Sequence, residues 1–340
     1  MDDLLFSLNT VFPLLVMMAV GFTARRVGVI GESAARQINA CVFKIFLPLL
    51  LCFNIVDTQL GTSTDVRTLL YAFITTLLCF GTLFFITPRL CRDRASCGVL
   101  IQGIARSNYA IFGIPLVMMM YPEGDTSIAV LMVAVVVPVF NVLSTIALMI
   151  FGGEKSSPWR IVKGVLLNPL ILGTLAGFLL WYFRIPIPTL IETPLRSLGS
   201  VATPLALFTL GASLDFGKAR ANSRLLVIGV AGRLVVVPLI FLSLAVALGI
   251  RDVSLAALIA VYASPTSVSS FPMAQQMGGN GDLAGGQVVF TTVFSILTVF
   301  LWVFALKSLG FLAQSEPAGF FPYFSLSPRS CSLFLRAGML

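Results

Sequence analysis

Two clusters of polar residues and prolines interrupt otherwise apolar stretches, and they carry residue types that could bind a small anion. One cluster runs from Asn108 to Pro115, and the other runs from Ser264 to Pro272. Amide and hydroxyl groups can orient a carboxylate, while an interior proline frees backbone polar groups at a cost of about 3 kcal/mol. We predict that the ligand-binding residues are Asn108, Gly113, Pro115, Ser264, Pro265, Thr266, Ser267, Ser270 and Pro272.

Three basic residues lie inside apolar stretches, where a charge costs about 2.5 to 3.5 kcal/mol at the centre of a membrane helix. Arg106 directly precedes the first cluster and is a candidate charge partner for an anion. Arg233 could face the same cavity, a lipid headgroup or a helix C-terminus. Lys44 is close enough to a helix end to extend into water. The acids that could carry protons lie at helix ends and in loops, the nearest being Asp57, Asp65 and Asp215.

The residue inventory argues against an enzyme. The chain has no histidine, which removes Ser-His and Cys-His catalysis and histidine metal ligands. It also lacks a Gly-x-x-x-x-Gly-Lys-Ser/Thr nucleotide-binding loop. We expect no catalytic residues, no metal site and no cofactor. The net charge of +8 is scattered over loops, so nucleic acid is not an expected partner.

The composition is that of a membrane protein. Hydrophobic residues make up 58% of the chain, charged residues 11%, and the mean hydropathy is +0.99, whereas soluble domains are about a quarter charged. Apolar stretches long enough to span about 30 Å of bilayer predict ten transmembrane helices, at residues 4–24, 38–57, 67–87, 98–121, 126–151, 164–183, 197–216, 225–248, 253–276 and 283–309.

These stretches repeat once, with landmark residues shifted by 156 or 157 positions. Pro48 matches Pro204 at a shift of 156, and Pro115 matches Pro272 at a shift of 157. A nearly constant shift over successive segments is hard to obtain by chance. The predicted organisation is a first five-helix repeat (1–152), a cytoplasmic linker (153–163), a second repeat (164–310) and a poorly ordered C-terminal tail (311–340).

The distribution of basic residues predicts the orientation of the repeats. Most basic loop residues fall on one side, which the positive-inside rule makes cytoplasmic, so the N-terminus is expected outside. An odd number of helices per repeat then inverts one half relative to the other. Inverted repeats with a midplane binding site are typical of secondary transporters. The broken fourth and ninth helices should meet there, with Pro115 and Pro272 opening half-helices whose N-terminal ends favour an anion.

Several short motifs also match a known family of carriers. They are Ile45-Phe46-Leu47-Pro48, Ser107-Asn108-Tyr109 leading to Gly113-Ile114-Pro115-Leu116, Asn168-Pro169-Leu170, and Thr203-Pro204-Leu205-Ala206. With them the chain resembles bacterial members of the auxin efflux carrier family, which include malate and malonate permeases. The resemblance implies an all-α membrane fold like that of the bile-acid/sodium symporters, with ten helices in two inverted five-helix repeats and helices 4 and 9 crossing. It also implies that Asn108 and the proline segments form the substrate site.

We therefore predict a multi-pass secondary active transporter of the cell membrane, a permease or efflux carrier for a small organic carboxylate such as malate or malonate. It would work by alternating access within the lipid bilayer, with H+ or Na+ as a coupling ion or with the membrane potential alone. The main alternative is a membrane receptor or sensor that retains the carrier fold. Carriers of this shape often pair through their scaffold, which leaves a homodimer as an open alternative.

Residues 313–340 fit neither the repeat nor the family pattern, since they mix Ser, Pro, Phe and Arg without periodicity. We predict a poorly ordered appendage. Limited proteolysis of the purified protein should remove it and leave the helical part intact. A homogeneous, protease-resistant tail would contradict this prediction.

Overall fold

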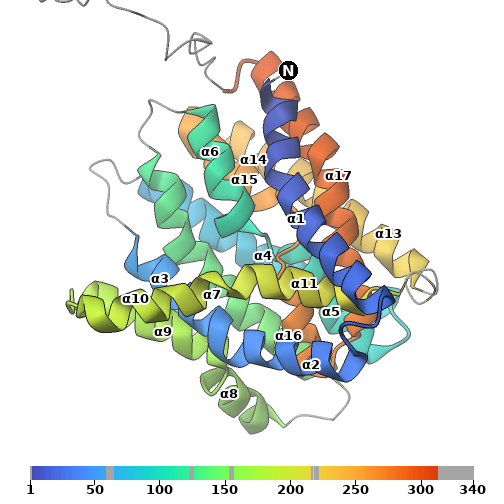
Figure 1. Cartoon of the computed structure of the whole chain (residues 1–340). Helices are drawn as coiled ribbons and strands as arrows, with labels where there is room; N and C mark the ends of the chain where they lie inside the picture. Colours follow the sequence, from blue (N-terminus) through green and yellow to red (C-terminus); the bar gives the residue numbers. More distant parts are fainter. Residues whose placement is uncertain are drawn as a thin grey trace, which may run out of the picture.

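The computed structural model describes residues 2–58, 65–121, 126–152, 157–215, 217 and 222–312. Every regular element in these ranges is helical, as the composition predicts (Figure 1). Five helices are long and apolar enough to cross a membrane, or six if one bent pair counts as a single span. The chain is therefore a multi-pass membrane protein. The predicted tail beyond residue 312 lies outside the described residues.

The helices follow the order of the predicted stretches. They are α1 (Asp2–Arg26), α2 (Glu32–Cys41), α3 (Leu47–Val56), α4 (Val66–Leu90), α5 (Arg94–Ala105), α6 (Ile114–Met120), α7 (Ser127–Phe151), α8 (Pro158–Leu166), α9 (Pro169–Tyr182), α10 (Thr189–Ser200), α11 (Ala202–Ser213), α13 (Ser223–Ala231), α14 (Val237–Ala247), α15 (Asp252–Tyr262), α16 (Ser270–Gln276) and α17 (Gly281–Ser308). Three π-helical segments join some of them: η1 (Val42–Phe46), η2 (Tyr109–Gly113) and η3 (Gly232–Val236).

Each π-helical segment ends two residues before a proline. Pro48, Pro115 and Pro238 stand in the first turns of α3, α6 and α14, just after η1, η2 and η3. A proline has no N–H and its ring clashes with the carbonyl four residues earlier, which here belongs to the π-helical segment. The wider π turn accommodates both effects, so these helices continue through their prolines.

This geometry corrects the expectation that Pro115 opens a half-helix. The second half of the broken fourth span begins at Tyr109, because η2 runs directly into α6. Pro272 does lie in the first turn of its half-helix, since α16 begins at Ser270.

The segment predicted as a linker, residues 153–163, is helical from Pro158 onward. Here α8 precedes α9 at a bend of 51°. The Ser157 hydroxyl accepts the Arg160 N–H at 3.3 Å, and the Asn168 side chain accepts the Leu170 N–H at 2.9 Å. The bend falls before Pro169, because a proline disfavours helical geometry at the residue that precedes it.

Packing divides the helices into two sets. The scaffold set contains α1, α2, α3, α9, α10 and α11, in which α1 packs along α11 and α3 packs along α9. The crossover set contains α4 to α7 and α13 to α17, in which α5 and α4 pack on α7, and α16 packs on α17. The sets meet mainly where α1 lies beside α17, which Figure 1 shows, and where α7 contacts α9.

Glycines allow the closest approaches within the scaffold set. A Cβ on Gly21 of α1 would lie 2.0 Å from the Phe208 carbonyl oxygen of α11, and a Cβ on Gly177 of α9 would lie 2.4 Å from the Cys52 carbonyl oxygen of α3. Small residues at such crossings are typical of membrane helix pairs. The two contacts are related by the sequence shift, because Gly21 to Gly177 and Cys52 to Phe208 are both 156 positions.

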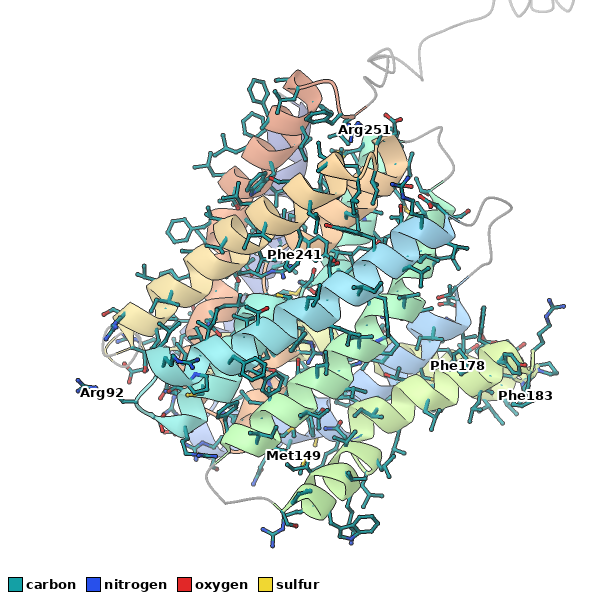
Figure 2. The ribbon with its side chains drawn as sticks, turned by 180° about the vertical axis from the view of Figure 1, so that it is seen from behind. Arg92, Met149, Phe178, Phe183, Phe241 and Arg251 are labelled. Carbon is teal, nitrogen blue, oxygen red and sulfur yellow. The ribbon has the colours of Figure 1, made fainter. Side chains whose placement is uncertain are left out.

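Arg251 and Arg92 lie toward opposite ends of the molecule (Figure 2). Figure 2 shows Arg251 at one end and Arg92 and Met149 toward the other. Phe178 on α9 and Phe183 directly after it point outward and are 45% and 64% exposed, as expected for a surface that contacts lipid.

Substitution of the scaffold glycines tests this packing. Gly21→Ala should destabilise the protein by about 1–3 kcal/mol, because the new methyl group meets a backbone carbonyl that cannot rotate away. The measurement is thermal unfolding in detergent. Gly81→Ala in α4 is the matched control, since nothing lies within 4 Å of its added Cβ and alanine favours a helix by up to about 1 kcal/mol over glycine. Equal melting temperatures for both variants would refute the close contact.

Candidate functional site

The two broken spans cross each other, as the sequence predicts. Ser107, just after α5, forms an antiparallel bridge with Thr266, which follows α15. The Asn108 N–H donates to the Pro265 carbonyl at 2.9 Å, and the Ser267 N–H donates to the Arg106 carbonyl at 3.3 Å. Backbone groups freed at membrane depth must find hydrogen-bond partners inside the protein. Here the backbone of each break supplies partners for the other.

Two hydroxyl groups at the crossing donate hydrogen bonds to nearby backbone carbonyls. Ser264 donates to the Ala260 carbonyl at 2.5 Å and Thr266 donates to the Gly103 carbonyl at 2.6 Å. The Thr266 N–H donates to the Thr291 hydroxyl of α17 at 3.1 Å. Ser264 and Thr266 thus hold the unwound chain in place by donating both hydroxyl protons to backbone carbonyls.

Arg233 of η3 binds the C-terminal ends of α5 and α15, the helices that precede the two breaks. It is fully buried, and its guanidinium donates to the carbonyls of Ile104 and Ala105 at 3.2 Å, of Val261 at 2.7 Å and of Ser264 at 2.8 Å. The last carbonyls of a helix lack partners, and each helix end carries about −0.5 charge. Two such ends offset the charge of Arg233, so this arginine stabilises the crossing and does not line the cavity.

Arg106 has different surroundings. It is 3% exposed, and its guanidinium donates to Asn141 Oδ1 at 2.7 Å, Ser269 Oγ at 2.8 Å and Met273 Sδ at 2.9 Å. All three acceptors are neutral, and the described part of the chain provides no acidic partner for it. A buried charge that no opposite charge offsets is costly, so Arg106 makes this side of the crossing attractive to an anion.

A small cavity of about 50 Å³ lies beside Arg106, with room for a few water molecules. Arg106, Asn108 and Ser267 line it together with α3, α7 and α11. Asn108 is 3% exposed and its side-chain nitrogen has no hydrogen-bond partner among the described residues. A buried donor without a partner costs about 1–3 kcal/mol, which a bound acceptor would recover.

The remaining predicted ligand residues are placed elsewhere. Gly113 allows η2 to approach α15, since a Cβ there would lie 2.9 Å from Ala260 Cβ. The Ser270 hydroxyl is buried and has no described partner, but it is not part of the cavity wall. The predicted residues that do not line the cavity are Gly113, Pro115, Ser264, Pro265, Thr266, Ser270 and Pro272. Lys44 is exposed on η1 and does not line the cavity.

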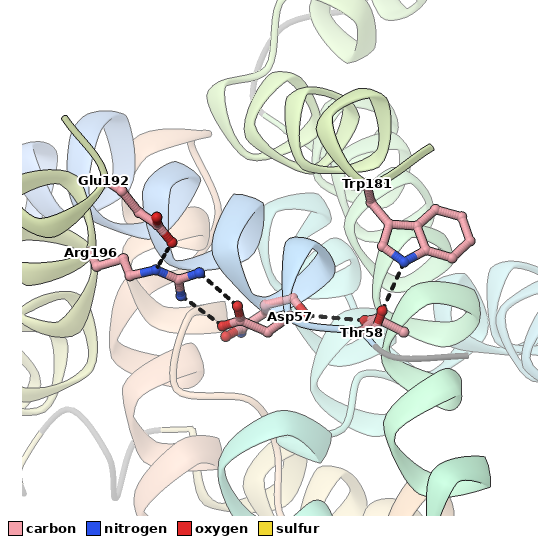
Figure 3. A network of polar contacts seen from close by, with 6 residues as sticks. Asp57, Thr58, Trp181, Glu192 and Arg196 are labelled. Carbon is pink, nitrogen blue, oxygen red and sulfur yellow. Dashed lines mark hydrogen bonds and ion pairs between the residues drawn. The ribbon is translucent and has the colours of Figure 1, made fainter. Parts of the chain in front are cut away.

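The acids considered as proton carriers are engaged at helix ends. Asp57 forms a bidentate pair with Arg196 at 2.7 and 2.8 Å, and Arg196 also donates to Glu192 at 2.7 Å (Figure 3). Partial burial would raise the pKa of Asp65, but hydrogen bonds from Thr68 and Ser254 hold that pKa below its usual value. Asp65 therefore caps α4 as a carboxylate.

Asp215 accepts the Gly217 N–H at 2.8 Å. None of the Asp and Glu side chains that the structure describes is buried. The part of the chain that the structure describes contains no group of three His, Cys, Asp or Glu side chains that could hold a metal ion.

Sequence reasoning missed several polar residues around the cavity, among them Thr203 of α11, which lines it. Asn141 of α7 is fully buried between Arg106 and Thr174 of α9, to which its amide donates at 3.3 Å. Ser269 accepts from Arg106, and Asn54 of α3 lines the cavity. Asn54 and Asn141 were detectable in principle, because each is a lone amide within an otherwise apolar helix.

Replacement of Arg233 tests its role at the crossing. Arg233→Met should lower the free energy of unfolding by at least about 3 kcal/mol, because four carbonyls lose their donor. Arg233→Lys keeps the charge with fewer donors and should be intermediate. Lys44→Met is the control, since Lys44 is exposed and should change stability little. Thermal unfolding in detergent measures all three, and an unaffected Arg233→Met protein would contradict the assignment.

Comparison with known proteins identifies the family. A family model described as "Membrane transport protein" matches residues 6–303. An "Uncharacterized transporter" of Methanothermobacter thermautotrophicus is 25% identical over 302 residues, 87% of this chain and 97% of that protein. A "Putative malonate transporter" of Rhizobium meliloti is 24% identical over 320 residues, 92% of this chain and 98% of that protein. The chain therefore belongs to the membrane transport protein family, the family of the auxin efflux carriers, and is a transporter and not an enzyme.

Proposed function

We propose that this protein is a secondary active transporter that carries a small organic carboxylate across the cell membrane by alternating access. The observation that carries the proposal is a pair of neighbouring groups at the crossing, one with an uncompensated charge and one with an unused donor. Arg106 is a buried cation without an acidic partner, and Asn108 holds a buried amide nitrogen without an acceptor. A carboxylate satisfies both, because it is a charged acceptor with about four lone-pair sites. The relative named for malonate is consistent with this substrate class.

The architecture proposed with this function is ten transmembrane helices in two inverted five-helix repeats. The support is the pair of contacts Gly21 to Phe208 and Gly177 to Cys52, which the shift of 156 interchanges. Two broken spans that meet near the middle of the molecule fit the same arrangement. The crossover set would then move against the scaffold set to expose the cavity to alternate sides, with the N-terminus outside.

The driving force belongs to the same proposal. No described Asp or Glu is buried in a span, so no such carboxylate is available there to relay protons. If transport is coupled to protons, the proton would be carried on the substrate itself. Coupling to Na+ or to the membrane potential would need no buried carboxylate.

Uptake by proteoliposomes tests the proposal directly. Labelled malonate, malate, pyruvate and an uncharged control should be offered under imposed pH, sodium and voltage gradients. At least one carboxylate should show saturable uptake. Arg106→Gln and Asn108→Ala should weaken apparent affinity, with about 10- to 100-fold expected for Arg106, because hydrogen bonds to charged groups contribute about 1.5–3 kcal/mol.

Thr298→Val on α17 is the control, since this hydroxyl bonds only to its own helix at Phe294 and lies away from the cavity. The control should transport like the wild type. Absence of carboxylate uptake from folded wild-type protein under every gradient would refute the proposal.

A further inference from the structure

The wall of the cavity carries polar groups from separate parts of the chain. Arg106, Asn108, Ser267 and Ser269 come from the two breaks at the crossing. On α3 the lining residues run from Leu47 to Asn54, which is two turns or about 10 Å at 1.5 Å per residue, and Asn54 adds an amide. Most of the other lining side chains are apolar, among them Leu47, Leu50, Leu51, Ile111, Val137, Phe140 and Ala206, and Thr203 adds a hydroxyl.

Asn54 is available to a ligand. Its side chain is partly exposed, and no hydrogen bond of that side chain is found among the described residues. Its backbone carbonyl is used within the chain, since it accepts the Thr58 hydroxyl at 3.2 Å. An amide offers two donors and a carbonyl acceptor, so it can bind a hydroxyl, a carbonyl or a protonated carboxyl group.

The charges near Asn54 discourage a second ionised carboxylate. Three residues further along the chain, Asp57 pairs with Arg196, which also binds Glu192. This cluster holds two acids and one base, so its net charge is negative. Arg106 is the one cation among the residues that line the cavity. An ionised carboxylate beside Asn54 would lose hydration and find no opposite charge to compensate for the loss, which is costly.

We propose that Asn54 is a specificity-determining residue that binds an uncharged polar group at the far end of the substrate. This inference rests on the proposed function, in which Arg106 and Asn108 bind the carboxylate. The preferred substrate is then a short acid with one charge and a distal hydrogen-bonding group. A dicarboxylate enters as its singly protonated monoanion, with the neutral carboxyl group at Asn54.

Competition between matched acids tests the role of Asn54. Proteoliposomes are given differently labelled 4-hydroxybutyrate and butyrate together, which differ by one distal hydroxyl. The wild type should favour the hydroxy acid, and Asn54→Leu should reduce that preference about 2- to 10-fold, the net value of one neutral hydrogen bond. The ratio is measured within the same vesicles, so it does not depend on how much of each variant folds.

Thr298→Val is the control, because the Thr298 hydroxyl bonds to Phe294 of its own helix and Thr298 does not line the cavity. It should leave the ratio unchanged. A preference that is unaltered in Asn54→Leu, or one that is lost equally in Thr298→Val, would overturn the assignment.

The pH dependence supplies a second readout. Uptake of malonate or succinate should rise as the external pH falls through the second carboxyl pKa of each acid, while uptake of 4-hydroxybutyrate should stay level over the same range. Dicarboxylate uptake that increases with the dianion concentration would overturn the inference and leave the proposed function intact. Wild-type protein that transports none of these acids would overturn both.

Discussion

The rest of the site depends on one constraint, which is that a backbone carbonyl or N–H at membrane depth needs a partner within the protein. Two broken spans leave many such groups unpaired. The bridge between Ser107 and Thr266 pairs some of them, and Arg233 pairs the carbonyls at the ends of α5 and α15. Because these contacts hold the backbone at the crossing, the side chains of residues 106–108 can line the cavity.

The two buried arginines divide the work at the crossing. Arg233 binds helix C-terminal ends, whose partial negative charges offset it. Arg106 binds only neutral acceptors, so its charge is left for a ligand. Asn141 links Arg106 to Thr174 on α9. The proposed ligand site is thus connected by side-chain hydrogen bonds to the boundary between the crossover and scaffold sets.

The sequence predicted where the two chain breaks lie and that they meet, because prolines and hydroxyl residues in equivalent positions mark both of them. It did not predict which hydroxyls face the cavity. In an unwound segment, side-chain direction has no fixed period, so Ser264 and Thr266 looked equivalent to Ser267 until the neighbouring helices were placed. Pro115 misled for a related reason, since a π turn lets the helix pass through the proline and moves its start to Tyr109.

The partners of buried cations were also beyond sequence reasoning. Arg233 was recognisable as an expensive residue, but the four carbonyls that it binds come from α5, α15 and the segment after α15, which only the tertiary fold brings together. Asn54 and Asn141 lacked a local signal stronger than a single amide in an apolar run. Their importance depends on residues that only the folded chain brings near them.

The glycine contacts of the scaffold set have an evolutionary consequence. Gly21 and Gly177 each face a carbonyl oxygen of the opposing helix, and every amino acid has the same carbonyl. No substitution at position 208 or 52 can make room for a side chain at the glycine, so compensating mutations are closed off. These two positions should resist neutral drift while the residues around them diverge, and the packing at these two crossings would then be preserved in its backbone geometry more than in its side chains.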